Sequence, residues 1–194
     1  MSTRGLWGFV VDGEVKVTYN HYDSYPSGLG DDLLRFARGV ARGIQPSARE
    51  RVAALRMVDA SDGPSASDVE RLARFANLNV GSQEIKDWYV LLRETQGNPV
   101  ATLDAGAMID SRDFAADSLF CEWGYVIDLD ANVFEVYCGF QHAQHSDGRF
   151  AADERPERRT DGYWPIRLIA TYPLDALPDE LDEDALDPEE GEGE

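Results

Sequence analysis

Side chains that can bind or react with a small molecule are concentrated in a short stretch near the start of the sequence. They combine hydrogen-bond donors, acceptors and a histidine that titrates near neutral pH. The set is Arg4, Asn20, His21, Tyr22, Asp23, Ser24 and Tyr25. Such groups at the end of a rigid strand can hold a polar ligand. They can instead cap the turn at residues 28–30 and the following helix, with Arg4 paired to Asp23, and the sequence leaves both interpretations open.

Four acidic side chains farther along the chain are a second candidate for chemistry. Asp128, Asp130, Glu122 and Glu135 carry the oxygen ligands that a divalent cation prefers. Asp130, however, occupies a predicted turn, where aspartate is favoured for its local hydrogen bonds. The turn interpretation is preferred, and no metal site is predicted here.

The remaining candidates for cofactor or metal chemistry are weak. His142 and His145 are three residues apart and could share a metal on a helix, but they lie in a polar loop without an acidic ligand nearby. The sequence holds no nucleotide-binding glycine loop, no metalloprotease helix and no nucleophile elbow. We therefore predict no cofactor.

The segment before the polar stretch has the pattern of a β-hairpin. Asp12-Gly13 is a strong turn signal because a type I′ turn needs positive φ at both central positions. The predicted pairs are Val11–Glu14, Phe9–Lys16, Trp7–Thr18, Gly5–Asn20, Thr3–Tyr22 and Ser2–Asp23. The first strand is apolar on both faces, which predicts that it lies in the interior of a sheet.

Helices are predicted in the middle of the chain and strands at both ends. Apolar residues at helical spacing predict helices near residues 31–43, 47–58, 64–78 and 82–95, with a short one at 100–108. Strands are predicted at 120–129, 133–140 and 163–172. We expect an α+β fold in which an antiparallel sheet, built from the N-terminal hairpin and the C-terminal strands, is covered by about four helices.

The charge is distributed unevenly along the chain. The formal net charge is −19, and residues 175–194 hold many carboxylates but no lysine or arginine. We expect residues 1–174 to form a single domain and residues 175–194 to be a disordered acidic tail. Without a basic stripe, nucleic acid is not expected as a partner. The tail could bind a protein partner, and the oligomeric state is left open.

The cysteines and the hydropathy predict a cytoplasmic protein. Cys121 and Cys138 lie in neighbouring predicted strands and are expected to be free thiols. No apolar run has the length of a membrane helix, and no signal peptide is predicted, so no membrane partner is expected.

Three motifs of the chain resemble an uncharacterised family of small bacterial and phage-type proteins. They are TRG at residues 3–5, YNHYDSYPSGLG at 19–30 and WGYVIDLDANVFEVYCGF at 123–140. The resemblance spans about residues 3–172. It supports the α+β fold and the polar stretch as a site, and it implies no particular activity.

The expected architecture also resembles the N-terminal-nucleophile hydrolases, in which a terminal Cys, Ser or Thr attacks an amide carbonyl and its own α-amino group acts as base. Removal of Met1 would expose Ser2, and further trimming would expose Thr3. The resemblance implies that Asp23 orients the amine and that Arg4 binds a substrate carboxylate, with His21 as a further catalytic candidate.

Two functions from different classes therefore remain. The first is hydrolysis of a small amide or amide-like metabolite, with Ser2, Thr3, Arg4, His21 and Asp23 as catalytic candidates. In that function Asn20, Tyr22, Ser24 and Tyr25 would bind the ligand. The alternative is a non-catalytic interaction or effector protein that binds a protein partner through the same pocket or the acidic tail.

Overall fold

The N-terminal hairpin forms as its turn sequence predicts. The structure, a computed structural model, describes residues 3–45, 47–81, 84–152 and 162–186. Strands β1 (Gly5–Val11) and β2 (Glu14–Asn20) pair from Val11–Glu14 to Gly5–Asn20, in the predicted register. Asp12 and Gly13 have φ of 52° and 77°, as a type I′ turn requires.

The predicted pairing does not continue beyond the hairpin strands. The carbonyl of Thr3 accepts a hydrogen bond from the backbone N–H of Ser24 at 3.3 Å, so Thr3 does not lie opposite Tyr22 as predicted. The chain leaves the strand because Asp23 adopts a left-handed conformation, with φ of 59°. Ser2 lies outside the described residues.

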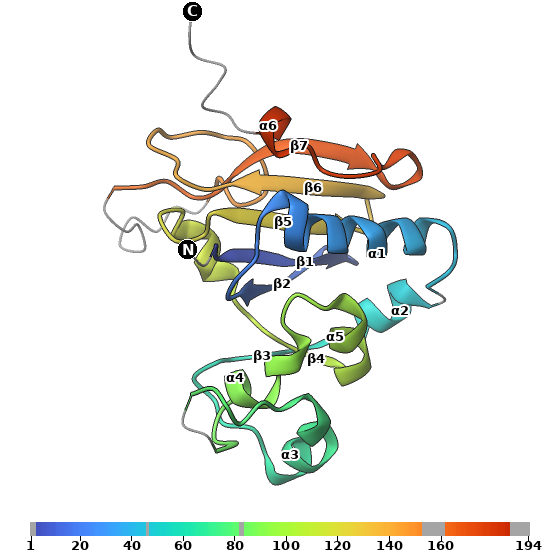
Figure 1. Cartoon of the computed structure of the whole chain (residues 1–194), viewed down its shortest axis with the longest axis vertical. Coiled ribbons are helices and arrows are strands. Elements are labelled where there is room, and N and C mark those ends of the chain that lie inside the picture. The colour runs from blue at the N-terminus through green and yellow to red at the C-terminus, as the bar shows by residue number, and fades with distance from the viewer. Residues whose placement is uncertain (1–2, 46, 82–83, 153–161, 187–194) are drawn as a thin grey trace, which may run out of the picture.

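The hairpin belongs to a five-stranded sheet with the order β2-β1-β5-β6-β7 (Figure 1). The C-terminal strands are β5 (Trp123–Asp128), β6 (Val133–Cys138) and β7 (Arg167–Pro173). Neighbouring strands are antiparallel except β1 and β5, which run parallel. The predicted α+β class is confirmed, and every residue of β1 is buried, as its apolar faces indicated.

Each face of the sheet is covered by apolar side chains. Helix α1 (Asp31–Ala41) packs on the face that carries Trp7 and Phe9, through Leu33, Leu34 and Phe36. The other face carries Leu6 and Val10 and is covered by side chains of the connecting segments, including Phe114 and Phe150. This cover on both sides explains why an N-terminal strand is apolar throughout.

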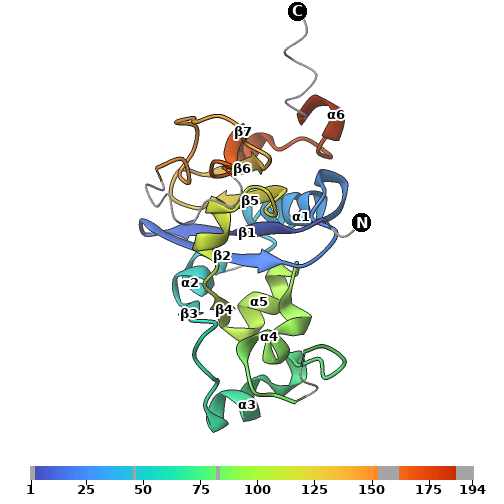
Figure 2. The ribbon, with the colours of Figure 1, turned by 90° about the vertical axis from the view of Figure 1, so that its left-hand side faces the viewer.

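The middle of the chain contains shorter elements than predicted. The helices are α2 (Ala48–Ala53), α3 (Ala66–Leu72), α4 (Trp88–Leu91) and α5 (Pro99–Ala105). The predicted helices at 47–58 and 100–108 end early, because β3 (Arg56–Val58) and β4 (Ala107–Ile109) form a parallel pair. The predicted helix at 64–78 is shortened to α3 and ends in a 3₁₀ turn at Ala73–Phe75. Of the predicted helix at 82–95, the described residues before Trp88 are not helical, and α4 is followed by a 3₁₀ turn at Arg93–Thr95. Figure 2 shows these elements beyond the β2 edge of the sheet.

The acidic C-terminal segment differs from the expectation in the part that the structure describes. Residues 175–186 contain α6 (Glu183–Leu186), and Leu181 and Leu186 are buried in the main core. The backbone N–H of Leu181 donates to the Asp31 carboxylate at 2.9 Å, and Arg38 donates to the carbonyls of Pro178 and Asp179. The expected disorder of this part was wrong because two leucines anchor it. Residues 187–194 lie outside the described part of the chain.

Cys121 and Cys138 are both buried free thiols. Burial raises the pKa of the Cys121 thiol well above its ordinary value, so it behaves as a small apolar side chain. In the described part of the chain, every helix is too short or too polar to cross a membrane.

Candidate functional site

The YNHYDSYPSGLG segment forms a tightly bonded turn between β2 and α1. The Asn20 Nδ2 donates to the carbonyl of Tyr22 at 2.6 Å and to the Ser24 Oγ at 2.9 Å. The Tyr125 hydroxyl donates to the carbonyl of Ser24 at 3.0 Å. Asn20 and Ser24 are buried, so both side chains hold the shape of the loop.

The glycines of this segment allow the turn to close. A Cβ at Gly28 would lie 2.7 Å from the Asp23 carbonyl oxygen and 2.8 Å from its carboxylate. The Asp23 carbonyl also accepts the backbone N–H of Leu29 at 2.9 Å. The turn-capping interpretation of this stretch therefore describes its backbone. The side chains of Asn20, Tyr22 and Asp23 also face a cavity.

Three of the predicted residues line one polar cavity of about 400 Å³. We call it the Asn20 pocket, and its lining is Asn20, Tyr22, Asp23, Leu29, Asp32, Asn77, Val80, Arg93, Glu94, Gln96 and Gly97. One wall is formed by the YNHYDSYPSGLG segment at residues 19–30, which we call the motif loop, together with the start of α1. The other wall comes from the segment between α4 and α5 and from residues near Asn77.

The Asn20 side chain presents an acceptor to this pocket. Its two amide protons are used within the loop, whereas no described residue donates to its Oδ1. A Cβ added to Gly97 would lie 3.2 Å from that oxygen, so only glycine leaves it open there. Asn20 as a residue is 5% exposed, and its Oδ1 is not one of the buried atoms without a partner, so this oxygen is open to water or to a ligand in the cavity.

Arg93 supplies the donors of the opposite wall. Its guanidinium lies 5.5 Å from the ring centre of Tyr22 and 5.2 Å from that of Tyr89. Nη1 donates to the Gln96 side chain. The two rings hold a flat donor group in one orientation in the lining that also contains Asn20 and Asp23.

The other predicted residues lie outside the pocket. The Arg4 guanidinium lies 5.3 Å from the Phe120 ring, and its backbone N–H donates to Glu122 at 3.3 Å. Among the described residues no ion pair joins Arg4 to Asp23, so that predicted pair is wrong. Tyr25 contributes through its backbone, whose carbonyl accepts the N–H groups of Gly28 and Gly30.

His21 is not part of the pocket lining and is held by Tyr19. Its Nδ1 is 2.9 Å from the Tyr19 hydroxyl, and the rings meet edge to face. Burial and the nearby charges of Arg93 and Arg4 lower the pKa of His21, so the imidazole is neutral at pH 7. Arg4, His21 and Asp23 thus do not converge on one cavity.

Thr3 is 2% exposed at the head of β1. Its Oγ1 is buried and has no hydrogen-bond partner among the described residues. A buried hydroxyl without a partner is unusual, and this one lies beside the motif loop through the bond between its carbonyl and Ser24.

The acidic residues near the second hairpin have structural partners. Asp130 accepts the backbone N–H groups of Asp12 and Gly13 and pairs with Arg49 at 2.7 Å. Asp128 accepts the N–H groups of its own turn. No group of three metal-ligating side chains occurs within the described residues. The preferred turn interpretation of Asp130 agrees with these bonds.

Sequence reasoning missed the wall formed by Arg93, Gln96 and Gly97. Its only signal in the sequence is the run Gln96-Gly97-Asn98-Pro99, whose glycine and proline are typical of the end of a helix. Comparison of the chain with protein-family models, with curated proteins and with solved structures found no match. Function must therefore be argued from the pocket.

Proposed function

We propose that the chain binds a small metabolite carrying an amide or amine group in the Asn20 pocket. The observation that carries the proposal is the Asn20 Oδ1, which lines the cavity and has no donor among the described residues, although the residue as a whole is only 5% exposed. A ligand N–H would satisfy this acceptor. Arg93 lies on the opposite wall and would donate to the carbonyl or carboxylate of the same ligand.

The charge of the lining favours a nitrogen group that is positive or strongly polar. Asp23, Asp32 and Glu94 line the pocket against one cation, Arg93. Asp32 is paired with Arg35 at 2.6 Å, and Glu94 accepts from Asn77 at 2.6 Å. Asp23 is the carboxylate of this lining to which no described side chain is bonded. The cavity volume of about 400 Å³ lies near the lower end of the volumes of small-molecule sites, so the ligand must be small.

Asp23→Asn is expected to weaken binding of such a ligand by about tenfold or more, because a hydrogen bond to a charged group contributes roughly 1.5–3 kcal/mol. Asparagine tolerates the left-handed backbone at this position, so the loop keeps its shape. Calorimetric titration with a panel of amino acids, primary amides and small amines measures the change.

Asp62→Asn is the matched control, since Asp62 is an exposed aspartate remote from the pocket lining. It should leave the affinity unchanged. Equal weakening by both variants would mean that general charge, and not the pocket, attracts the ligand. Absence of binding across the whole panel would contradict the proposal and favour the interaction-protein alternative.

Hydrolysis at the N-terminus is a second candidate, favoured by the buried Oγ1 of Thr3. In that reaction the hydroxyl oxygen bonds to an amide carbonyl carbon and the free α-amino group takes the hydroxyl proton. The C–N bond breaks, the amine leaves with that proton, and water then cleaves the ester to a carboxylic acid.

This reaction requires Thr3 to be the terminal residue, after removal of Met1 and Ser2, or Ser2 to be the terminal residue, after removal of Met1 alone. Mass spectrometry of the intact purified protein is therefore expected to show the loss of Met1, or of Met1 and Ser2, if the chain is this kind of hydrolase. Thr3→Ala should then abolish the release of amine from any amide that the wild-type protein hydrolyses. Retention of Met1 would rule out the mechanism without affecting the binding proposal.

A further inference from the structure

The outer edge of β2 carries backbone groups that do not pair with β1. In a hairpin whose turn is closed by Val11 and Glu14, the backbone groups of Glu14 and Lys16 point toward β1, and those of Val15 and Val17 point away from it. β2 is the last strand of its sheet on this side. Its outward groups therefore need partners from elsewhere in the chain or from another molecule.

Only part of this edge is covered by the described residues. The Val17 carbonyl accepts the backbone N–H of Ser111 at 3.0 Å. No described residue bonds the outward N–H or carbonyl of Val15, two residues closer to the turn. An open backbone donor and acceptor on one residue form the unit to which an extended chain can add as a further strand.

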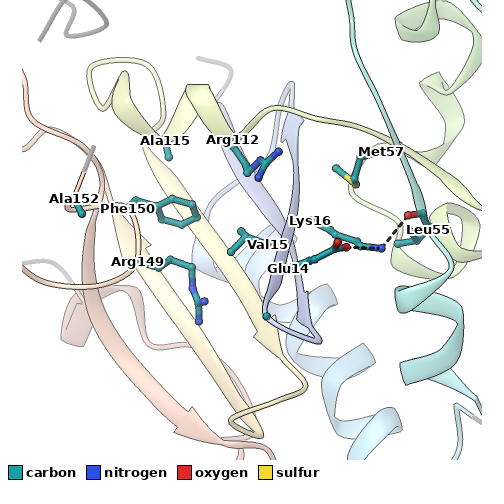
Figure 3. Close-up of a pocket in the computed structure, with 11 residues that line it drawn as sticks. Glu14, Val15, Lys16, Leu55, Met57, Arg112, Ala115, Arg149, Phe150 and Ala152 are labelled. Carbon is teal, nitrogen blue, oxygen red and sulfur yellow. Dashed lines mark hydrogen bonds and ion pairs between the residues drawn. The ribbon is translucent and has the colours of Figure 1, made fainter. Parts of the chain in front are cut away.

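A cavity of about 890 Å³ lies along this open edge. It is lined by Gly13, Glu14, Val15, Lys16, Leu55, Met57, Arg112, Ala115, Arg149, Phe150 and Ala152. Figure 3 shows that Val15 projects toward Phe150 on one side of the strand, and Lys16 toward Leu55 on the other. The edge thus runs along the floor of a slot with an apolar wall on each face of the sheet.

The wall on the Lys16 side is rigidly attached. The Lys16 side chain is 4% exposed, and its ammonium donates to the carbonyls of Val52, Ala53 and Leu55 at 3.2, 2.7 and 3.0 Å. These carbonyls lie at and just after the end of α2, so the buried cation fixes the segment leading into β3 against β2. A ligand would find the slot already formed.

One end of the slot carries a positive donor. The Arg112 Nε and Nη2 bind Asp110, whereas no described residue pairs with its Nη1. Its side chain is 57% exposed. A carboxylate entering the slot could bind this remaining edge of the guanidinium.

We propose that the β2 edge binds an extended peptide segment of a partner protein, with apolar side chains alternating across the backbone and an acidic residue near Arg112. The peptide backbone bonds the N–H and carbonyl of Val15. Successive side chains point to opposite faces of the added strand, so one packs against Phe150 and Ala115 and the next against Leu55 and Met57. This site is separate from the Asn20 pocket and does not depend on the function proposed for it.

The test uses fluorescence polarisation with labelled, N-acetylated heptapeptides. They alternate valine with threonine and carry one glutamate near either end. Matched peptides are methylated on the central backbone nitrogens, which removes their donors and leaves the side chains unchanged. Binding is expected for the unmodified peptides and is expected to weaken by about tenfold or more on methylation.

Two variants of the protein address the edge itself. Val15→Pro removes the outward N–H without removing a bond to β1, since proline is tolerated on edge strands, and it is expected to weaken binding by about tenfold. Val15→Thr keeps the N–H and the branched side chain and should bind like wild type. Arg112→Gln should weaken binding of glutamate peptides only, and Arg35→Gln, an exposed paired arginine elsewhere, should have no effect.

Failure of every unmodified peptide to bind would overturn the proposal, as would equal binding of the methylated peptides. A second copy of this chain is the competing occupant. If sedimentation shows a dimer that Val15→Pro converts to a monomer while no peptide competes, the edge is a self-association site and the proposal is wrong. Retention of the melting temperature in each variant shows that the protein has folded.

Discussion

Replacing Arg149 by methionine is expected to lower the free energy of unfolding at pH 7 by about 3–5 kcal/mol, the usual cost of leaving buried charges without their partner. Arg149 donates to Glu135 at 2.8 and 2.6 Å and to Asp128 at 2.7 Å. Asp128 and Glu135 are 6% and 8% exposed. They project from neighbouring strands on the same face of the sheet, because Glu135 lies opposite Val126, and Val126 and Asp128 are two residues apart on one strand. Denaturant unfolding of the variant beside wild type measures the loss.

Two further variants show whether charge is the cause. Adding Glu135→Gln to the Arg149 variant should recover much of the lost stability, because it removes one of the two negative charges. Arg35→Gln should cost no more than about 1 kcal/mol, since both members of its ion pair are exposed. A loss below 1 kcal/mol for the Arg149 variant would mean that water reaches both carboxylates.

The hairpin was predictable because its information is local. A two-residue turn fixes the register of both strands, so the Asp12-Gly13 signal alone determined each pair from Val11–Glu14 to Gly5–Asn20. The prediction stopped being correct at Asp23, where the backbone turns away. Nothing in the strand pattern specifies that left-handed residue.

The segments of the second sheet were not predictable in the same way. β3 and β4 are three residues each and lie far apart in the sequence, and both follow helices whose apolar spacing continues into them. A short apolar run fits a helix or a strand, and the choice here depends on the parallel partner. The Gly106 conformation, with φ of 64°, ends α5 and releases the chain into β4.

Only the part of the site that is local in the sequence could be predicted. Asn20, Tyr22 and Asp23 are neighbours in sequence and were predicted together, whereas Arg93 and Gly97 reach the pocket only through the fold. The exclusion of Arg4 depends on a tertiary contact, because its guanidinium lies over the Phe120 ring. His21 is held by Tyr19, its neighbour two residues earlier, through a local contact that the strand pattern did not reveal.

Truncation after Pro178 is expected to lower the melting temperature by roughly 6–24 °C, in place of the negligible change that a disordered tail would give. Leu181 and Leu186 are 4% and 7% exposed. Burying each leucine contributes about 1.5–3 kcal/mol, and in a chain of this size each kcal/mol corresponds to about 2–4 °C. Thermal unfolding followed by circular dichroism measures the shift, with a chain that ends at Leu186 as the reference.

Point variants separate packing from charge in this segment. Truncation also removes many carboxylates, whose mutual repulsion opposes folding, so the measured loss understates the contribution of the leucines. Leu181→Ala keeps the charge and should cost about 2–5 kcal/mol through the cavity it leaves beside Tyr125 and Gly30. Asp184→Ala, an exposed neighbour, should have little effect. If Leu181→Ala were as harmless as Asp184→Ala, the segment would contribute no packing energy, and its contacts with α1 would not hold it against the core.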